Sequence, residues 1–368
     1  MPVVGGAVAV PVYVPVWPAR QHTTKAYAAL EPEVRVGTVP LWNLPKTTDL
    51  LPDAWAAMYC RLVRKVHAVH EDSPGWIDAP FIAYDQIRTV AKAIDDHCSR
   101  DLLRPVTGPE RHPRQQAFAV GTARKHRCGL GIRVTVPDTW DERADGVVDG
   151  VVSLLRRLRR TAAADLLLDM AGVPGDRPDA GEEARRALAA LLPLASWRTT
   201  ALLGGGFPRL KAEMPASGTY VAPRPDWTMW HTIRSGNGRG PGPLGYGDYG
   251  VQPVSALERR PGTDRDSGRS KGPYWGALCY TTEHAFVASR MLTRGSGNRV
   301  ALNRASARRI VGLPGFRRAG AAAAERWYLC CADGPDTSGK GTGTPEKWLW
   351  AGNVQHATFV VRSLGGAR

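Results

Sequence analysis

Two aspartates and one arginine in strand-like segments carry the clearest chemistry in this sequence. Asp169 ends a short apolar run, and Asp248 lies between glycines. Two carboxylates at one site can bind a divalent cation or act as a general acid and a general base. Arg133 interrupts an apolar segment, where a charge is costly unless it is paired or faces a ligand. We therefore treat Asp169 and Asp248 as candidate catalytic residues and Arg133 as a candidate ligand-binding residue.

Each of these side chains also has a structural alternative. Asp169 and Asp248 can equally serve as caps or as salt-bridge partners. Arg133 can lie on the outward face of its strand near a helix layer, or it can form a buried pair with Asp169. The sequence leaves these alternatives open.

A run of three glycines suggests a second kind of chemistry. Gly204, Gly205 and Gly206 directly follow the strand-like segment Thr199–Leu203. Glycine lets the backbone approach an anion closely, so that N–H groups can hold a phosphate. The alternative is a tight turn that needs a positive φ angle before the next residues. We count the three glycines among the candidate ligand-binding residues.

Three further patterns fall short of a complete motif. Residues 334–341 approach the phosphate-binding loop G-x-x-x-x-G-K-[ST] after the strand-like Arg326–Cys331, but Gly341 replaces the Ser or Thr that binds magnesium. His67 and His70 are three residues apart at an expected helix end, without an identifiable third metal ligand. Tryptophans concentrate toward the C-terminal end, where they fit packing or base stacking. We predict no metal and no cofactor.

Alternating elements position the candidate residues. Strand-like and helix-like segments alternate over the first two hundred residues, as in parallel strands joined by helices. An eighth strand, Leu244–Val251, follows a segment compatible with a helix, 227–233. The seven strands expected before it are Val10–Trp17, Arg35–Leu44, Trp76–Tyr84, Arg104–Thr107, Gly129–Val136, Asp165–Ala171 and Thr199–Leu203.

This order of elements predicts an α/β fold, a (β/α)8 TIM-barrel-like domain with a C-terminal α+β extension. A doubly wound open sheet is the alternative, which the number of strands disfavours. Barrels of this kind place their sites at the C-terminal ends of the strands. Arg20 and Asn43 lie at or just after the ends of the first two expected strands. They join the candidate ligand-binding residues for that reason.

The chain divides into three parts by composition. Residues 1–251 form the expected barrel-like domain, and residues 252–273 form a loop rich in Gly, Pro and Arg. Residues 274–368 form the α+β extension, which we expect to pack on the barrel.

Charge and cysteine content limit the function classes. The 368 residues carry 49 Lys and Arg against 34 Asp and Glu, a net charge of +15, which favours polyanions such as nucleic acid or nucleotides. Six scattered cysteines without a C-x-x-C pair fit a reducing cytoplasm. The N-terminus has no basic region of a signal peptide, and no apolar run reaches the length of a membrane span. We expect a soluble cytoplasmic protein with no membrane partner.

Several short segments follow one another along the chain in a characteristic order: Tyr13–Trp17, Ala28–Leu30, Val39–Pro45, Gly206–Pro208, Gly247–Gly250, Tyr280–Thr281 and Gln355–Val360. In this order they resemble the Beta protein family of prophages and bacterial genomes, which is distinct from the annealing recombinase of that name. The resemblance implies a barrel-like α/β fold and an association with mobile elements and phage defence, without an established reaction. We add His356, from the last motif, to the candidate ligand-binding residues.

The chain departs from this family at two places. Pro18, Ala19 and Arg20 stand where members commonly carry basic residues after the first strand. Asn43 stands where members commonly carry Glu after the second strand, so a carboxylate of that position is missing here.

Two functions from different classes follow. The first is a protein of phage–host conflict whose barrel mouth binds a phosphate-bearing ligand, either nucleic acid or a nucleotide. The second is a non-catalytic sensor or scaffold that docks on a phage component or on a nuclease of the same defence system.

Overall fold

The structure is a computed structural model of the chain, and most of the 368 residues are described. The described residues are 13–46, 51–70, 73–98, 102–136, 140–159, 162–173, 175, 177–210, 218–235, 244–257, 275–292 and 298–366. The expected loop 252–273 therefore lies outside them from residue 258 onward.

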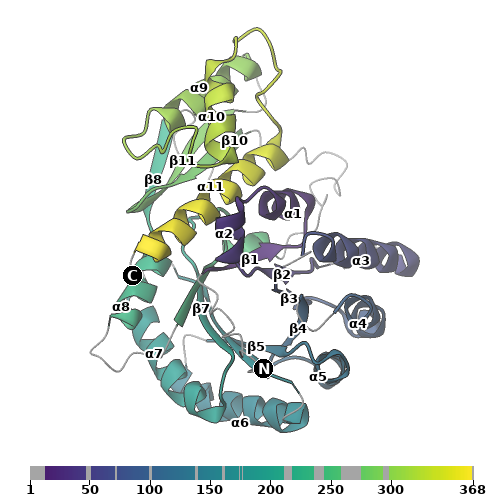
Figure 1. Cartoon of the computed structure of the whole chain (residues 1–368). Helices are drawn as coiled ribbons and strands as arrows, with labels where there is room; N and C mark the ends of the chain where they lie inside the picture. The colour runs from purple at the N-terminus through teal and green to yellow at the C-terminus, as the bar shows by residue number, and fades with distance from the viewer. Residues whose placement is uncertain are drawn as a thin grey trace, which may run out of the picture.

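Eight parallel strands close into a barrel, which confirms the predicted (β/α)8 fold (Figure 1). The expected eighth strand is present as β9, which pairs with both β7 and β1 and so closes the ring. The barrel strands are β1 (Tyr13–Pro18), β2 (Leu41–Asn43), β3 (Gly75–Asp78), β4 (Leu103–Thr107), β5 (Leu130–Thr135), β6 (Ala164–Gly172), β7 (Thr199–Gly205) and β9 (Leu244–Asp248).

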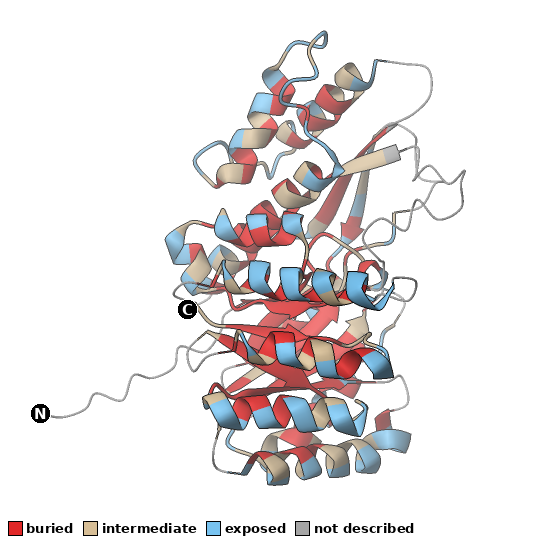
Figure 2. Cartoon of the chain, turned by 90° about the vertical axis from the view of Figure 1, so that its right-hand side faces the viewer, coloured by how far each residue is buried: buried red, intermediate tan, exposed pale blue. Residues whose placement is uncertain are grey.

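Helices surround the barrel, each with one apolar face toward the strands (Figure 2). In α3, for example, Trp55, Tyr59, Val63 and Val66 recur at helical spacing and are buried. The helices of this layer are α1 (Gln21–Ala28), α2 (Pro32–Val36), α3 (Pro52–His67), α4 (Ile87–Asp95), α5 (Pro113–His126), α6 (Trp140–Leu158), α7 (Ala180–Leu191) and α8 (Pro225–Arg234).

The barrel interior holds an apolar middle with a charged group at the N-terminal end of the strands. Side chains such as Val14, Trp76 and Leu167 fill the middle. Below them, the buried carboxylate of Asp165 accepts from Trp76 Nε1 at 2.9 Å and from Arg198 Nε at 2.8 Å. Polar side chains fill the opposite, C-terminal end, where barrels of this class place their sites.

A second, antiparallel sheet stands above the barrel (Figure 1). It has the order β10 (Trp275–Thr281), β11 (Ala285–Leu292), β8 (Gly218–Pro223), so its edge strand β8 comes from between barrel strands β7 and β9. Helices α9 (Arg299–Val311) and α10 (Ala323–Asp333) pack beside it. Helix α11 (Pro345–Gly366) packs on β10 and also on α1 and β1, and so joins the small sheet to the barrel.

In two segments the sequence predicted a strand where the structure has an α-helix. The segment Arg35–Leu44 was expected to be one strand, but its first residues belong to α2 and only Leu41–Asn43 pair as a strand. The strand-like Arg326–Cys331 lies within the helix α10, whose Tyr328 and Cys331 are buried. Short apolar runs do not distinguish a strand from a buried helix, which explains the second error.

Candidate functional site

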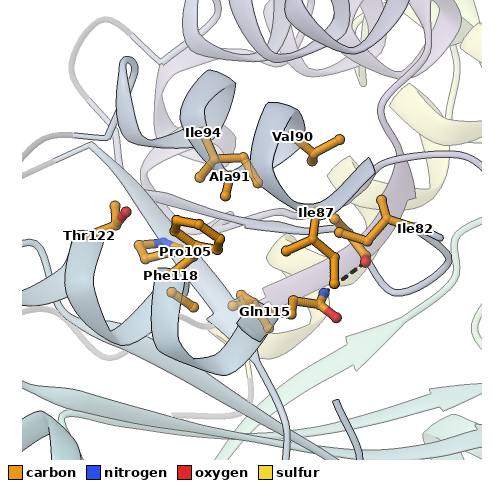
Figure 3. Close-up of a pocket in the computed structure, with 12 residues that line it drawn as sticks. Ile82, Ile87, Val90, Ala91, Ile94, Pro105, Gln115, Phe118 and Thr122 are labelled. Carbon is orange, nitrogen blue, oxygen red and sulfur yellow. Dashed lines mark hydrogen bonds between the residues drawn. The ribbon is translucent and has the colours of Figure 1, made fainter. Parts of the chain in front are cut away.

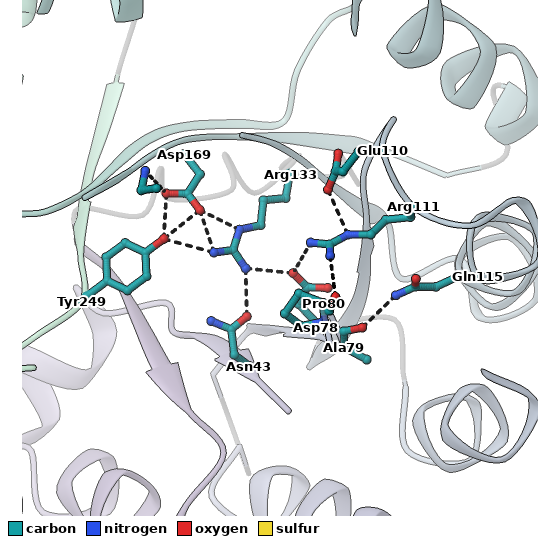
Figure 4. A network of polar contacts seen from close by, with 11 residues as sticks. Asn43, Asp78, Ala79, Pro80, Glu110, Arg111, Gln115, Arg133, Asp169 and Tyr249 are labelled. Carbon is teal, nitrogen blue, oxygen red and sulfur yellow. Dashed lines mark hydrogen bonds and ion pairs between the residues drawn. The ribbon is translucent and has the colours of Figure 1, made fainter. Parts of the chain in front are cut away.

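The guanidinium of Arg133 lies inside the barrel at the C-terminal ends of the strands (Figure 4). Its Nε and Nη2 donate to Asp169 Oδ2 at 2.9 and 2.6 Å. Its Nη1 donates to Asn43 Oδ1 and to Asp78 Oδ2, both at 2.9 Å. Nη2 also donates to the Tyr249 hydroxyl at 3.1 Å. Arg133 thus faces the interior in a buried pair with Asp169, and the outward alternative was wrong.

All five N–H groups of Arg133 have an acceptor within the protein. Burial acts to lower the pKa of Arg133, but Asp169 together with Tyr249 and Asp78 outweighs this effect, and the pKa of Arg133 lies well above its ordinary value. Because every donor is used, the side chain has none left for a ligand. Arg133 is therefore held as the fixed centre of a polar layer.

The partners of Arg133 are fixed in turn. The Tyr249 hydroxyl donates to the Asp169 carboxylate at 2.8 Å. Arg111 Nη2 lies 3.3 Å from Asp78 Oδ2, and its Nε pairs with Glu110 at the rim (Figure 4). Two carboxylates, Asp78 and Asp169, face one interior cation here, so this layer is ill suited to attract a phosphate.

A second cluster lies on the outer side of the barrel wall, around Asp248 at the end of β9. Its Oδ1 accepts from the Tyr13 hydroxyl at 2.7 Å and from Gly250 N at 2.8 Å. Its Oδ2 lies 2.7 Å from His356 Nε2, and Thr281 Oγ1 lies 2.8 Å from His356 Nδ1. The predicted site residues Asp248 and His356 therefore meet, although 108 positions separate them.

Glycine is required two residues after Asp248. Gly250 has φ of +61°, in the left-handed region that favours glycine. A Cβ there would stand 2.5 Å from Asn353 Oδ1 and 2.9 Å from Trp17 Nε1. This tight turn directs the Gly250 N–H to the Asp248 carboxylate.

The two carboxyl groups of this cluster, Asp226 and Asp248, have pKa values shifted in opposite directions. The single Tyr246 hydroxyl proton faces both Asp226 Oδ2 and Asp248 Oδ2. Burial and the Asp248 charge raise the pKa of Asp226 to about 6. Burial opposes ionisation of Asp248, but the adjoining His356 and the hydrogen bonds from Tyr13 and Gly250 N together outweigh it, and the pKa of Asp248 is lowered. Below pH 6, protonated Asp226 therefore donates to Tyr246, which donates to ionised Asp248.

Arg224, at the N-cap of α8, is a buried cation that forms no ion pair with any described carboxylate. It is 2% exposed, and its Nη1 donates to the Thr282 carbonyl oxygen at 3.4 Å. Among the described residues, its Nε and Nη2 have no hydrogen-bond partner, and neither has Asp226 Oδ1. Its guanidinium lies over the rings of Trp227, Phe286 and Phe359, at 4.6, 5.6 and 5.4 Å from their centroids.

The glycine run lies at the end of β7 and against α8. Gly204 and Gly205 belong to the strand itself. A Cβ on Gly205 would stand 2.2 Å from Val254 Cγ2, and the carboxyl group of Asp226 occupies the corresponding space at Gly206. The run thus permits close packing, and these contacts do not test its predicted role in phosphate binding.

Arg20 lies apart from both clusters. It is partly buried at the start of α1, near His22, and none of its described contacts reaches Arg133 or Asp248. The structure thus brings Asn43, Arg133 and Asp169 together, and separately Asp248 and His356. It places Arg20 elsewhere.

The weaker motifs have structural explanations. The buried Arg304 donates to four backbone carbonyls of residues 331, 335, 338 and 340, so it organises the segment that resembled a phosphate-binding loop. His70 is buried, with Nε2 accepting from Trp42 Nε1 at 2.7 Å and Nδ1 2.8 Å from the Ser73 carbonyl oxygen. Both ring nitrogens of His70 are thus used within the protein.

Sequence reasoning missed five residues of these clusters. Asp78 went unnoticed because the third strand was expected to run on to Tyr84, whereas it ends at Asp78. Tyr246 and Tyr249 flank Asp248 in the glycine-rich segment, which was the available signal for them. Nothing in the local pattern marked the remaining two, Arg224 and Asp226, because they follow a strand that belongs to the small sheet.

The described residues contain neither a cluster of metal ligands nor a membrane-spanning helix. No three His, Cys, Asp or Glu side chains gather there as metal ligands do. No helix in this part of the chain has the length and apolarity needed to cross a membrane.

The closed parallel barrel and its polar C-terminal end define a (β/α)8-barrel protein with buried charged clusters at the end where such barrels bind ligands. The chain belongs to the Beta protein family, whose sequence profile matches residues 13–362. Neither the curated proteins nor the solved structures contain a match to the chain.

The Arg133 layer leads to a prediction about stability. Arg133→Met would leave Asp78 and Asp169 buried without their cation, which costs about 3–5 kcal/mol of unfolding free energy. Urea unfolding at pH 7 measures this loss. Arg185→Met, which breaks an exposed pair with Glu182, is the control and should change stability by less than about 1 kcal/mol. A similar small loss for Arg133→Met would contradict the assigned role.

Asp226 leads to a prediction about pH. Its raised pKa means that the folded state binds a proton more tightly than the unfolded state, so this contribution to stability is present below pH 4 and is lost as pH rises through about 6. Asp226→Asn removes this dependence. The variant should gain stability relative to wild type by about 2–3 kcal/mol between pH 4 and pH 7. Urea unfolding at both pH values tests this, and a constant difference would exclude the protonated Asp226.

Proposed function

We propose that the chain binds a phosphate-bearing ligand, a nucleotide or nucleic acid, through Arg224 at the C-terminal face of the barrel. One observation carries this proposal: a guanidinium that is 2% exposed leaves Nε and Nη2 without acceptors in the described part of the chain. A buried charge is costly unless an anion compensates it. A phosphate group offers the paired oxygens that a guanidinium fork binds best.

The neighbouring carboxyl group supports this assignment. Asp226 does not form an ion pair with Arg224, and burial raises the pKa of Asp226 to about 6. Below about pH 6, a proton on Asp226 removes the nearest negative charge, so Arg224 then has its strongest attraction for an external anion. The Trp227 ring next to the guanidinium offers an aromatic surface near the same point.

Location and charge agree with the same ligand class. Arg224 and Asp226 lie at the start of α8, and therefore near the C-terminal ends of the strands, where barrels bind phosphate. The net charge of +15 favours the approach of polyanions. With the resemblance to proteins of prophages and bacterial genomes, these features support a role in phage–host conflict.

Ligand-dependent thermal unfolding tests the proposal. Inorganic phosphate and AMP serve as probes, because a ligand that binds the native state raises Tm. We expect at least one probe to raise the Tm of wild type and none to raise that of Arg224→Met. Without a probe, Arg224→Met should be as stable as wild type or more so, because it removes a buried charge that lacks a counter-ion.

Two results would contradict the proposal. One is a loss of several degrees in the Tm of ligand-free Arg224→Met, with the probe-induced shift intact, because Arg224 would then serve the fold. The other is failure of every probe with wild type, which would favour docking on a phage or nuclease partner. Arg185→Met, with the same change in charge at an exposed position, is the matched control.

A further inference from the structure

A surface groove between α4 and α5 combines exposed aromatic rings with arginines. It encloses about 570 Å³ and is lined by Tyr84, Asp85, Ile87, Arg88, Arg114, Ala117 and Phe118. Tyr84 is 55% exposed and Phe118 is 42% exposed, and both are among the few large apolar side chains on the described surface. None of these residues belongs to the Arg133 layer or to the Arg224 site.

Apolar side chains of α4 and α5 form the floor of the groove. Beneath it, Ile87 of α4 and Phe118 of α5 face each other over Pro105, with a residual cavity of about 30 Å³ (Figure 3). Gln115 donates from Nε2 to the Ala79 carbonyl oxygen at 2.9 Å and so fixes α5 to the end of β3. A cavity this small holds no ligand beyond a water molecule, so the open groove above it is the usable surface.

The charge at the groove is positive and unpaired. Arg88 and Arg114 are exposed, and neither forms an ion pair with a described carboxylate. The Arg114 guanidinium lies 4.9 Å from the centroid of the Tyr84 ring, and His112 meets that ring edge-on at 5.0 Å. Asp85 is the one carboxylate in the lining. Arg88 and Arg114 therefore give the groove a net positive charge in spite of Asp85.

The position of Arg114 is unfavourable in the free protein. Arg114 is the second residue of α5, whose first turn has no acidic residue, whereas Arg88 follows the short helix Tyr84–Gln86, which contains Asp85. Among the other barrel helices, α2, α3, α6, α7 and α8 have an acidic residue in the first turn and α1 has none. The N-terminal end of a helix carries a partial positive charge, so an anion near Arg114 would be favourable there.

From these observations we propose that the α4–α5 groove binds single-stranded nucleic acid. Arg88 and Arg114 would contact phosphates, and the exposed Tyr84 and Phe118 would stack on bases. Stacking on aromatic rings beside a basic groove is the chemistry by which proteins hold unpaired strands. A duplex hides its base faces within the stack and cannot use these rings. The proposal uses residues other than Arg224, so either proposal can fail without the other.

Binding of fluorescent oligo-dT and oligo-rU, with a DNA duplex for comparison, tests the groove over a salt series. Wild type should bind the single strands more tightly than the duplex. The double variant Arg88→Gln/Arg114→Gln should bind at least tenfold more weakly at low salt. Its slope of log affinity against log salt should be shallower by about 1.4, since each phosphate contact contributes about 0.7 for single strands.

The variant Tyr84→Ala tests stacking separately from charge. It should weaken single-strand binding between about fivefold and a hundredfold, with the salt slope unchanged. Tyr84 is preferred to Phe118 for this test because Phe118 also lines the small cavity below. The side chain is exposed, so Tm should stay within a few degrees of wild type.

The matched control is Arg61→Gln/Arg64→Gln, which removes two exposed charges from α3. It should bind the strands nearly as well as wild type. Equal losses in both double variants would show diffuse attraction to a basic surface and would overturn the proposal. Absence of single-strand binding at low salt, or unchanged binding in Tyr84→Ala, would overturn it as well. An Arg224→Met variant that still binds the strands would show that the groove acts independently.

Discussion

One arginine side chain inside the barrel connects the C-terminal ends of its strands. Arg133 projects from β5 and holds Asn43 of β2, Asp78 of β3, Asp169 of β6 and Tyr249 just beyond β9. A guanidinium has donors in one plane at fixed angles, so its acceptors must arrive in matching positions. Because two buried carboxylates also depend on this cation, no partner can move alone without leaving a charge exposed to an apolar surrounding. The loops above the barrel therefore start from a rigid platform.

The C-terminal extension is bound to the barrel by a comparable arrangement outside the wall. His356 of α11 meets Asp248 of β9, and Thr281 of β10 meets the other nitrogen of that histidine. Since α11 packs on α1 and β1 as well as on the small sheet, it covers the wall beside the closing strand. The small sheet takes β8 from the connection between β7 and β9. Arg224 and Asp226 therefore lie on a connection between two barrel strands that also supplies a strand to the small sheet.

The two clusters differ in how many hydrogen-bond donors of their central arginine lack an acceptor in the described part of the chain. Around Arg133 every donor of the cation is used, and two carboxylates surround it, so the layer gives rigidity. Around Arg224 the aromatic rings cover the guanidinium faces, while Nε and Nη2 have no acceptor among the described residues. Below about pH 6, the proton on Asp226 further reduces the negative charge nearby. Positive charge that no described carboxylate pairs with therefore lies near the C-terminal face, at Arg224 and at the α4–α5 groove.

Local patterns in the sequence determined the order of the elements and the barrel. Alternation of apolar strands with amphipathic helices depends on neighbouring residues, and it predicted all eight parallel strands, including the last. It also marked Arg133, Asp169 and Asp248 as unusual charges at strand ends. Where local signals were ambiguous, as for Arg326–Cys331, packing against α9 and α11 selected a helix.

Only the tertiary structure decided which of these charges meet. Tyr13 and Asp248 are 235 positions apart and become neighbours because the barrel closes between β1 and β9. The partners of Arg133 come from strands on several sides of the barrel, and their number decides that no donor remains for a ligand. Arg224 becomes a buried cation only because β11 and α11 fold over it. Burial and pairing arise from contacts between distant segments, and these contacts have no signature in the order of neighbouring residues.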